Sequence, residues 1–165
     1  MRFIPALLCV ISMILAGRVK CRQMTKRVRI LREIELFLKF MRPRTEYLHE
    51  PVSKTVSVLS NHSQLSELSF LSECSRLCES GMDFPKAWAN AVMSVPLKKC
   101  DEELLLSLGE AVVSANFSDI LGVISLYETA FRRSAETALD TLENNRKMCM
   151  SVFSSIGILL GIIII

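Results

Sequence analysis

The sequence predicts an all-α protein, a helical bundle whose long first and last helices run into two terminal transmembrane segments. Three observations support this fold class. Apolar residues recur through the interior at the three- and four-residue spacing of an amphipathic helix, without a convincing alternating strand pattern. Pro and Gly residues stand between these stretches, where helices commonly begin and end. The apolar residues, 50% of the chain, are concentrated at its two ends.

The first apolar run, Phe3 to Gly17, has the length of either a secretory signal or a short membrane span. As a helix it rises about 22 Å, which is less than the ~30 Å hydrocarbon core of a bilayer. Seven cations and no acid follow it between Arg18 and Arg32. Because cations hold that side in the cytoplasm, we expect a retained span over residues 1–17. The alternative is signal cleavage and export of a helical domain stapled by disulfides.

The last apolar run, residues 148–165, rises about 27 Å as a helix and is just long enough to span a membrane. Two cations precede it at residues 146–147. The positive-inside rule then places both termini outside and a helical bundle, residues 18–147, in the cytoplasm. Gly157 and Gly161 have the spacing that lets transmembrane helices approach closely, so they are a candidate helix contact.

A basic block directly after the first apolar run is a candidate membrane surface. Its residues are Arg18, Lys20, Arg22, Lys26, Arg27 and Arg29. Beside a membrane span, such a block favours anionic lipid headgroups over nucleic acid as its partner. A solvated face without lipid contact satisfies the same electrostatics.

The first interior helix should run from the membrane to about Arg42, where Pro43 ends it. Its apolar stripe consists of Ile30, Ile34, Phe37 and Met41. Pro51 suits the first turn of a short second helix that ends at residues 61–63. The buried face of this second helix should consist of Val52, Val56 and Leu59.

A third helix should end at Gly81, which can supply a left-handed cap, and Pro85 should open a fourth that Pro96 ends. The third helix carries Leu65, Leu68, Leu71 and Cys78, and the fourth carries Phe84, Trp88, Ala91, Val92 and Val95. Because Trp88 lies on a regular apolar stripe, we expect it to anchor the core rather than face a partner.

A fifth helix should begin at Cys100, where the acids at residues 101–103 favour the positive end of the helix dipole. Its predicted buried face consists of Leu104, Leu108, Ala111, Val112 and Ala115. After a break at residues 116–118, the last helix continues into the C-terminal apolar run. Its near-heptad stripe consists of Ile120, Ile124, Tyr127, Phe131, Ala135, Ala138 and Leu142.

The sequence predicts no catalytic, metal-binding or cofactor-binding residue. Its six glycines form no phosphate-binding loop. His49, two residues before Pro51, is interpreted as a turn or cap residue rather than a general base. Cys74 and Cys78 lie one turn apart near a helix C-terminus, so we interpret them as core thiols rather than a redox pair. An enzyme that uses these two thiols is the weaker alternative.

Several features recur together along the chain: a Tyr-x-His-x-Pro stretch, a Gly followed by Ala-Trp, a Leu-Gly pair and two glycines in the tail. The residues that carry them are Tyr47, His49, Pro51, Gly81, Ala87, Trp88, Leu108, Gly109, Gly157 and Gly161. With the two apolar ends, their order and spacing resemble the stage III sporulation protein AB family of endospore-forming bacteria over essentially the whole chain. The sequence departs from the family's pattern at Val113, Asn116 and Ile120.

The resemblance implies a non-enzymatic scaffold, similar to the inner-membrane platform proteins of type II secretion and type IV pilus systems. It implies a location in the mother-cell membrane facing the forespore, with the central domain in the cytoplasm. The implied partners are a cytoplasmic secretion-type ATPase and other membrane components of a channel between the two cells, while membrane lipids are the partner expected for the basic block. Nucleic acid is not an implied partner, no cofactor is implied, and a homo-oligomer is compatible with the resemblance. A lipid-surface organiser unrelated to secretion is an alternative.

Overall fold

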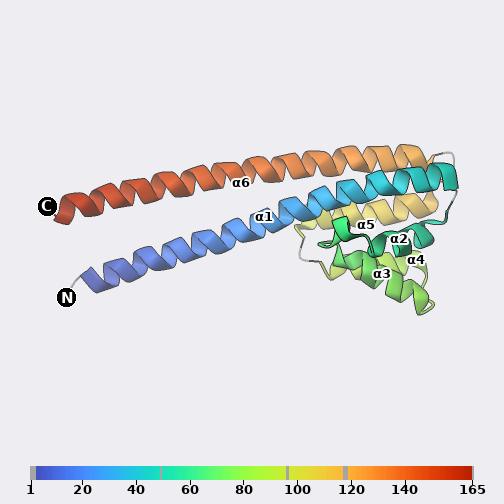
Figure 1. The fold of residues 1–165 in the computed structure, drawn as a ribbon, viewed down its shortest axis with the longest axis horizontal. Helices are drawn as coiled ribbons and strands as arrows, with labels where there is room; N and C mark the ends of the chain where they lie inside the picture. The colour runs from blue at the N-terminus through green and yellow to red at the C-terminus, as the bar shows by residue number, and fades with distance from the viewer. Residues whose placement is uncertain (1–2, 49, 96, 117–118, 165) are drawn as a thin grey trace. The chain divides into compact units, whose positions relative to one another are not determined.

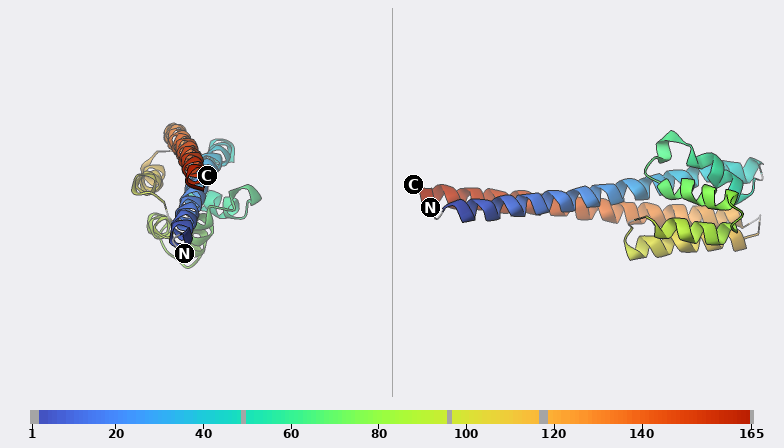
Figure 2. Two further views of the ribbon diagram at one scale, coloured as in Figure 1. Left: turned by 90° about the vertical axis from the view of Figure 1, so that its left-hand side faces the viewer. Right: turned by 90° about the horizontal axis from the view of Figure 1, so that it is seen from below.

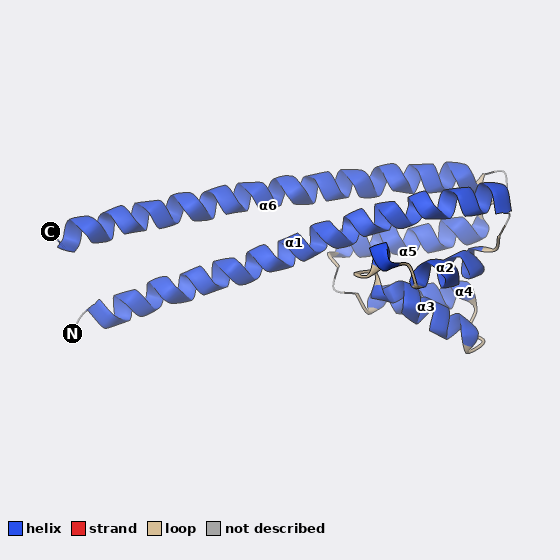
Figure 3. Cartoon of the chain, in the orientation of Figure 1, coloured by secondary structure: helices blue, strands red, loops and turns tan. Residues whose placement is uncertain are grey.

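The computed structural model describes the backbone of residues 3–48, 50–95, 97–116 and 119–164, and the side chains of those between residues 22 and 148. The elements are α1 (Phe3–Leu48), α2 (Val52–Ser60), a 3-10 turn (Ser63–Leu65), α3 (Ser69–Glu79), α4 (Phe84–Met93), α5 (Lys99–Ser114) and α6 (Ile120–Ile164) (Figure 1). Helices account for all the regular structure of the described residues, which confirms the all-α prediction (Figure 3).

The chain divides into two compact units. The terminal unit comprises Met1–Val28 and Glu136–Ile165, and the bundle unit comprises Arg29–Ala135. The bundle unit therefore contains four shorter helices together with the adjoining parts of α1 and α6. In it, consecutive helices run back and forth, so that the end of α1, the start of α2, the end of α5 and the start of α6 lie at one end (Figures 1 and 2).

In the terminal unit, Asn145 Nδ2 of α6 lies 3.4 Å from Met24 Sδ of α1. The side chains of residues 3–21 and 149–164 lie outside the described part, and with them the predictions for both apolar runs and for Arg18, Lys20, Gly157 and Gly161. Within the part that is described, no helix has an apolar stretch of the length needed to cross a bilayer.

Helix α1 continues through Pro43 to Leu48, so the prediction that Pro43 ends it is wrong. A proline inside a helix removes one backbone hydrogen bond and costs about 3 kcal/mol. The buried face nevertheless extends beyond it, because Met41 and Thr45 are both buried and Thr45 Oγ1 donates to the Met41 carbonyl at 3.1 Å. Pro43 itself is exposed. Packing on the opposite face therefore keeps the helix intact past the proline.

The predicted third helix starts later than its apolar pattern suggested. Leu65 belongs to the 3-10 turn and Leu68 precedes α3, although both side chains are buried. The Glu33 carboxylate of α1 accepts a hydrogen bond from the Glu67 N–H at 2.9 Å, two residues before α3 begins. A carboxylate of α1 thus accepts a hydrogen bond from a backbone N–H just before α3. The spacing of apolar residues within the third helix could not predict this contact.

The predicted left-handed cap at Gly81 is confirmed, with φ at +92°. The Gly81 N–H donates to the Cys78 carbonyl at 3.0 Å, and the Met82 N–H donates to the Leu77 carbonyl at 3.1 Å. This pair of bonds is the Schellman motif, which satisfies the last carbonyls of a helix. It turns the chain from α3 into α4, which begins at Phe84 beside the predicted Pro85.

The buried face of α5 is rotated from the predicted one. Leu108 and Val112 are buried as expected, whereas Leu104, Ala111 and Ala115 are half-buried. The other residues buried on this helix are Asp101, Leu105 and Gly109. Contact with an aromatic side chain of α4, described below, sets this orientation.

The stripe of α6 agrees with the prediction at five of its seven positions. Ile120, Ile124, Phe131, Ala135 and Ala138 are buried, whereas Tyr127 and Leu142 are half-buried.

Candidate functional site

Trp88 is the centre of the bundle core. Its indole ring makes an edge contact with Phe70, with ring centroids 5.3 Å apart and planes at 88°. Phe84 and Phe37 approach the same ring at 5.7 and 6.3 Å. The indole Nε1–H donates to the Leu105 carbonyl at 2.8 Å, so the one polar atom of the side chain is satisfied. Trp88 is buried, as expected of a core anchor.

Gly109 of α5 lies directly against this indole ring. A Cβ atom at Gly109 would stand 2.3 Å from Trp88 Cδ1 and 2.5 Å from Nε1. The absence of a side chain therefore lets the ring reach the Leu105 carbonyl, one turn earlier on the same helix. Ala87 and Leu108, which precede Trp88 and Gly109 in the sequence, are also buried. The Ala-Trp and Leu-Gly pairs, which the sequence presents as separate features, thus meet in one contact.

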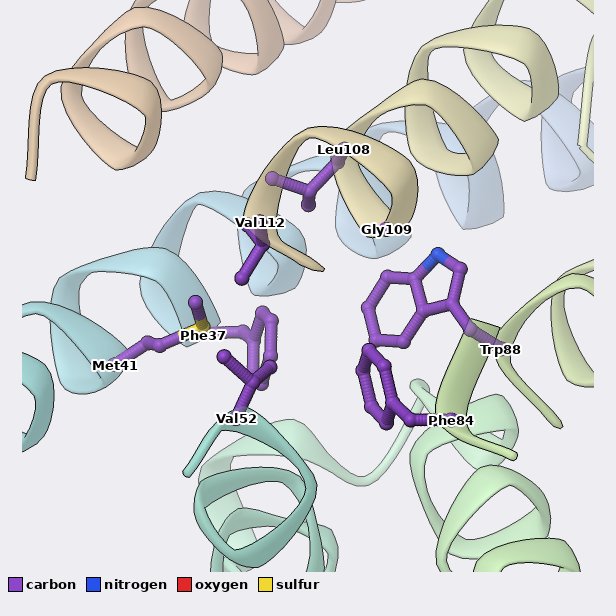
Figure 4. Close-up of a pocket in the computed structure, with 8 residues that line it drawn as sticks. All are labelled: Phe37, Met41, Val52, Phe84, Trp88, Leu108, Gly109 and Val112. Carbon is purple, nitrogen blue, oxygen red and sulfur yellow. The ribbon is translucent and has the colours of Figure 1, made fainter. Parts of the chain in front are cut away.

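A small apolar cavity adjoins the indole ring (Figure 4). It is lined by Phe37, Met41, Val52, Phe84, Trp88, Leu108, Gly109 and Val112 and has a volume of about 10 Å³. Pockets that hold small molecules have volumes of about 300–1,000 Å³. This cavity is a packing defect between α1, α2, α4 and α5, and its wall is too apolar to hold an ordered water.

Exposed apolar side chains occur at the end of the bundle unit where α1 and α5 end and α6 begins. Tyr47, Leu48, Val113 and Leu126 are 74%, 60%, 49% and 68% exposed. The first two close α1, Val113 belongs to the last turn of α5, and Leu126 lies in the second turn of α6. We call these four residues the end surface. Exposed apolar side chains from three helices at one end of a bundle make this end a candidate protein interaction site.

The two family-matching residues that the structure describes near this end, Tyr47 and Pro51, are both exposed. Tyr47 is part of the end surface, and Pro51 is exposed immediately before α2. The Pro51 carbonyl accepts the Thr55 N–H at 3.0 Å, so it begins the helical hydrogen bonding of α2. His49 lies outside the described residues.

Cys74 lies in the core, and Cys78 is half-buried one turn later. Burial, and to a lesser extent the neighbouring Cys78, raise the pKa of the Cys74 thiol to about 12. A thiol in this environment stays protonated at neutral pH, so it is a poor nucleophile. Among the described cysteines, Cys74, Cys78 and Cys100 are free.

Asp101 is the charged residue whose burial the sequence did not indicate. The sequence placed it in the first turn of the fifth helix, where a carboxylate is favoured by the helix dipole, but Asp101 is 1% exposed. Ser134 Oγ of α6 donates to Asp101 Oδ1 at 2.6 Å, and Cys100 Sγ lies 3.6 Å from the same oxygen. Asp101 therefore links α5 to α6. Among the described residues, no three His, Cys, Asp or Glu side chains are grouped so that they could hold a metal ion.

Four residues of the predicted basic block have described side chains. Arg22, Lys26 and Arg29 are exposed, and Arg27 is half-buried. Arg29 Nη1 lies 3.6 Å from Glu67 Oε1. Burial raises the pKa of the nearby Glu33 carboxyl group, and the negative charge of Glu67 raises it too, while the Glu67 N–H and Arg29 oppose both effects.

The stage III sporulation protein AB family model matches residues 2–165. No curated protein and no solved structure matches the chain. The family match covers both apolar ends, the Trp88–Gly109 contact and the end surface, and it confirms the resemblance inferred from the sequence motifs. The chain therefore belongs to the stage III sporulation protein AB family.

Proposed function

We propose that this chain is a non-enzymatic membrane scaffold of the endospore-formation apparatus, which couples a cytoplasmic secretion-type ATPase to a channel between mother cell and forespore. The family match supports a role in sporulation. The observation that carries the coupling role is the end surface, an exposed apolar group on a bundle whose interior is filled.

The filled interior favours a scaffold over an enzyme. The aromatic cluster around Trp88 leaves a cavity of only about 10 Å³. The buried thiol of Cys74 has a raised pKa and does not suit nucleophilic chemistry. A closely packed helical domain transmits a push or rotation applied at one end, because packed interiors have low compressibility.

The end surface has the composition of a binding site for a protein partner. Tyr47 combines a large apolar ring with a polar hydroxyl group, a combination enriched at the centres of interfaces. Leu48, Val113 and Leu126 add aliphatic area from three different helix ends. We assign this surface to the ATPase, since a soluble partner can reach the end of the bundle where α1 and α6 are joined to the shorter helices.

In this proposal, both apolar runs span the mother-cell membrane facing the forespore, and the central domain lies in the cytoplasm. The cations that follow the first run and precede the last run support this orientation under the positive-inside rule. Other membrane components of the channel would then contact the spans, with Gly157 and Gly161 as a candidate close-approach site.

Site-specific photocrosslinking tests the proposed contact. The full-length chain, carrying a benzophenone amino acid at Tyr47, would be irradiated in sporulating cells and its adducts identified by mass spectrometry. The control carries the same group at Gln64, an exposed residue of the 3-10 turn that follows α2. We expect an adduct with a phosphate-loop ATPase from position 47 and none from position 64. Equal yields from both positions, or no ATPase adduct, would contradict the proposal.

A further inference from the structure

Three exposed cations share one face of α1. Arg22, Lys26 and Arg29 are spaced by four and three residues, so they lie along one side of the helix over about 10 Å. Leu31 and Leu38, which are buried residues of the same helix, lie on the other side. We call these three residues the cationic face.

The cationic face is poorly neutralised by the protein itself. Arg22 and Lys26 form no ion pair with any described residue. Arg29 has a 3.6 Å contact with Glu67, but its side chain remains 66% exposed. Exposed pairs of this kind contribute little energy. The positive charge of the face is therefore available to an external anion.

We infer that the cationic face binds the headgroups of anionic phospholipids at the cytoplasmic surface of the membrane. This inference rests on the proposed membrane span over Phe3–Gly17. Along the α1 helix, Arg22 lies about 7 Å beyond Gly17, which corresponds to the headgroup layer of a bilayer. Lys26 lies about 13 Å and Arg29 about 18 Å beyond Gly17.

The distances predict unequal contributions. The attraction of a cation to an anionic surface decays over a Debye length of about 8 Å at physiological salt. Arg22 should therefore contribute most and Arg29 least, and Arg29 also shares its charge with Glu67. A role in holding the fold would produce the opposite order, because Arg29 is the one residue of the three with a contact to the bundle.

Lipid headgroups suit this face better than nucleic acid does. Binding to DNA through its backbone requires contacts with phosphates along the duplex, whereas the cationic face is short and lies directly after the proposed span. Anionic lipids, in contrast, diffuse in the plane of the membrane and gather around a small basic segment beside a span.

The test uses the full-length chain reconstituted in phosphatidylcholine vesicles that contain a trace of spin-labelled lipid. Electron paramagnetic resonance separates lipid held by the protein from free lipid, for labelled phosphatidylglycerol and for labelled phosphatidylcholine. The ratio of the two association constants is the selectivity. A cation at an anionic surface contributes about fivefold in binding. We therefore expect Arg22→Gln to lower the selectivity by up to about fivefold, Lys26→Gln less, and Arg29→Gln by less than about twofold.

A matched variant controls for the loss of charge. Arg42, Lys54 and Lys86 are exposed cations elsewhere on the bundle unit. Replacing these three with Gln should leave the selectivity unchanged, whereas replacing all three residues of the cationic face should lower it by more than any single replacement does. Circular dichroism of each variant shows whether the helices are intact, and Arg22→Gln touches no described contact of the bundle.

The possible results distinguish failure of the lipid-binding inference from failure of the proposed membrane span. Equal selectivity in the wild-type protein and the variant without the cationic face would overturn the inference while leaving the membrane scaffold intact. The same conclusion follows if the matched variant loses selectivity equally or if Arg29→Gln has the largest effect. Failure of the chain to hold either labelled lipid would instead contradict the membrane span, and with it the proposed function.

Discussion

The α-carbon of Gly109 faces the indole ring of Trp88 so closely that a Cβ atom there would stand 2.3 Å from Trp88 Cδ1. The contact joins α5 to α4 and allows the indole N–H to reach the Leu105 carbonyl. It also accounts for the rotation of the buried face of α5, because Gly109 faces the ring and Leu108 and Val112 line the cavity beside it.

Replacing Gly109 with Ala should destabilise the protein. Overpacking costs about 1–3 kcal/mol, here at the upper end because the obstructing atoms belong to a rigid ring. Alanine recovers about 1 kcal/mol of helix propensity, so the net loss should be about 2 kcal/mol in denaturant unfolding. Gly122 of α6 is the control, since a Cβ atom there meets nothing within 4 Å. Gly122→Ala should stabilise the fold, and a Gly109→Ala variant that matches it would refute the contact.

Gly81 should resist replacement for a different reason. Its surroundings are open, with nothing within 4 Å of an added Cβ atom, but its φ of +92° is unfavourable for other residues. Gly81→Ala should lower the free energy of unfolding by about 1–2 kcal/mol through backbone strain alone. Asn adopts left-handed conformations more readily, so Gly81→Asn should recover part of this loss. Equal losses from Ala and Asn in thermal unfolding would argue against strain as the cause.

The hydrogen bond between Ser134 and Asp101 should contribute to the free energy of unfolding more than a bond near an exposed helix end would. Removing the hydroxyl group leaves a buried carboxylate oxygen with one fewer donor, which costs about 1–3 kcal/mol. Ser134→Ala should therefore destabilise the bundle by an amount in this range. Thr129→Ala removes another hydroxyl group from the same helix, one bonded to the Ser125 carbonyl at 3.0 Å and exposed. Chemical denaturation should separate the two variants, and indistinguishable midpoints would contradict the buried link.

Glu33 should make stability depend on pH in a defined direction. Its folded pKa is raised above 4.5, chiefly by burial, so the folded chain binds this proton more tightly than the unfolded chain does. The stabilising contribution is complete below pH 4.5 and is lost as the pH rises through the folded pKa. Glu33→Gln mimics the protonated group, so it should stabilise the protein at pH 7, with the advantage disappearing on acidification below pH 4.5.

Glu50 should make stability depend on pH in the opposite direction, because its folded pKa is lowered rather than raised. Lys54 lowers the pKa of its carboxyl group by hydrogen bonding, and Arg44 acts in the same direction. Its contribution is therefore present above the unfolded pKa of 4.5 and lost as the pH falls through the folded value. Glu50→Gln should cost stability at pH 7 and cost less in acid. Unfolding curves of both variants at pH 7 and pH 4 test the two signs, and changes of the same sign would contradict this assignment.

Helical spacing was sufficient to predict most of the bundle. The stripe of Ile30, Ile34, Phe37 and Met41 is buried as expected, and the punctuation at Gly81 and Pro85 marks a real turn. Periodicity was sufficient here because the buried face of each helix follows from the spacing of apolar residues along that helix alone.

The errors arose where a distant residue decides the local outcome. Helix α1 passes Pro43 because the buried face continues to Thr45, and α3 begins late beside the Glu33 carboxylate. Asp101 can be buried because Ser134 donates a hydrogen bond to its carboxylate. Ser134 is 33 positions away in the sequence, so local spacing gives no sign of this bond. The end surface was also beyond prediction, since exposed and buried apolar residues look alike in a single sequence.

Binding between the full-length protein in nanodiscs and the ATPase of the same apparatus tests the central claim most directly. Tyr47→Ala removes the largest side chain of the end surface, whereas Val58→Ala truncates an apolar residue that is 42% exposed on α2, outside that surface. Central aromatic residues of interfaces contribute about 2 kcal/mol or more. A dissociation constant raised by about thirtyfold or more for Tyr47→Ala, and unchanged for Val58→Ala, is the predicted result. Unaltered binding by the Tyr47 variant would contradict the assignment of this surface to the ATPase.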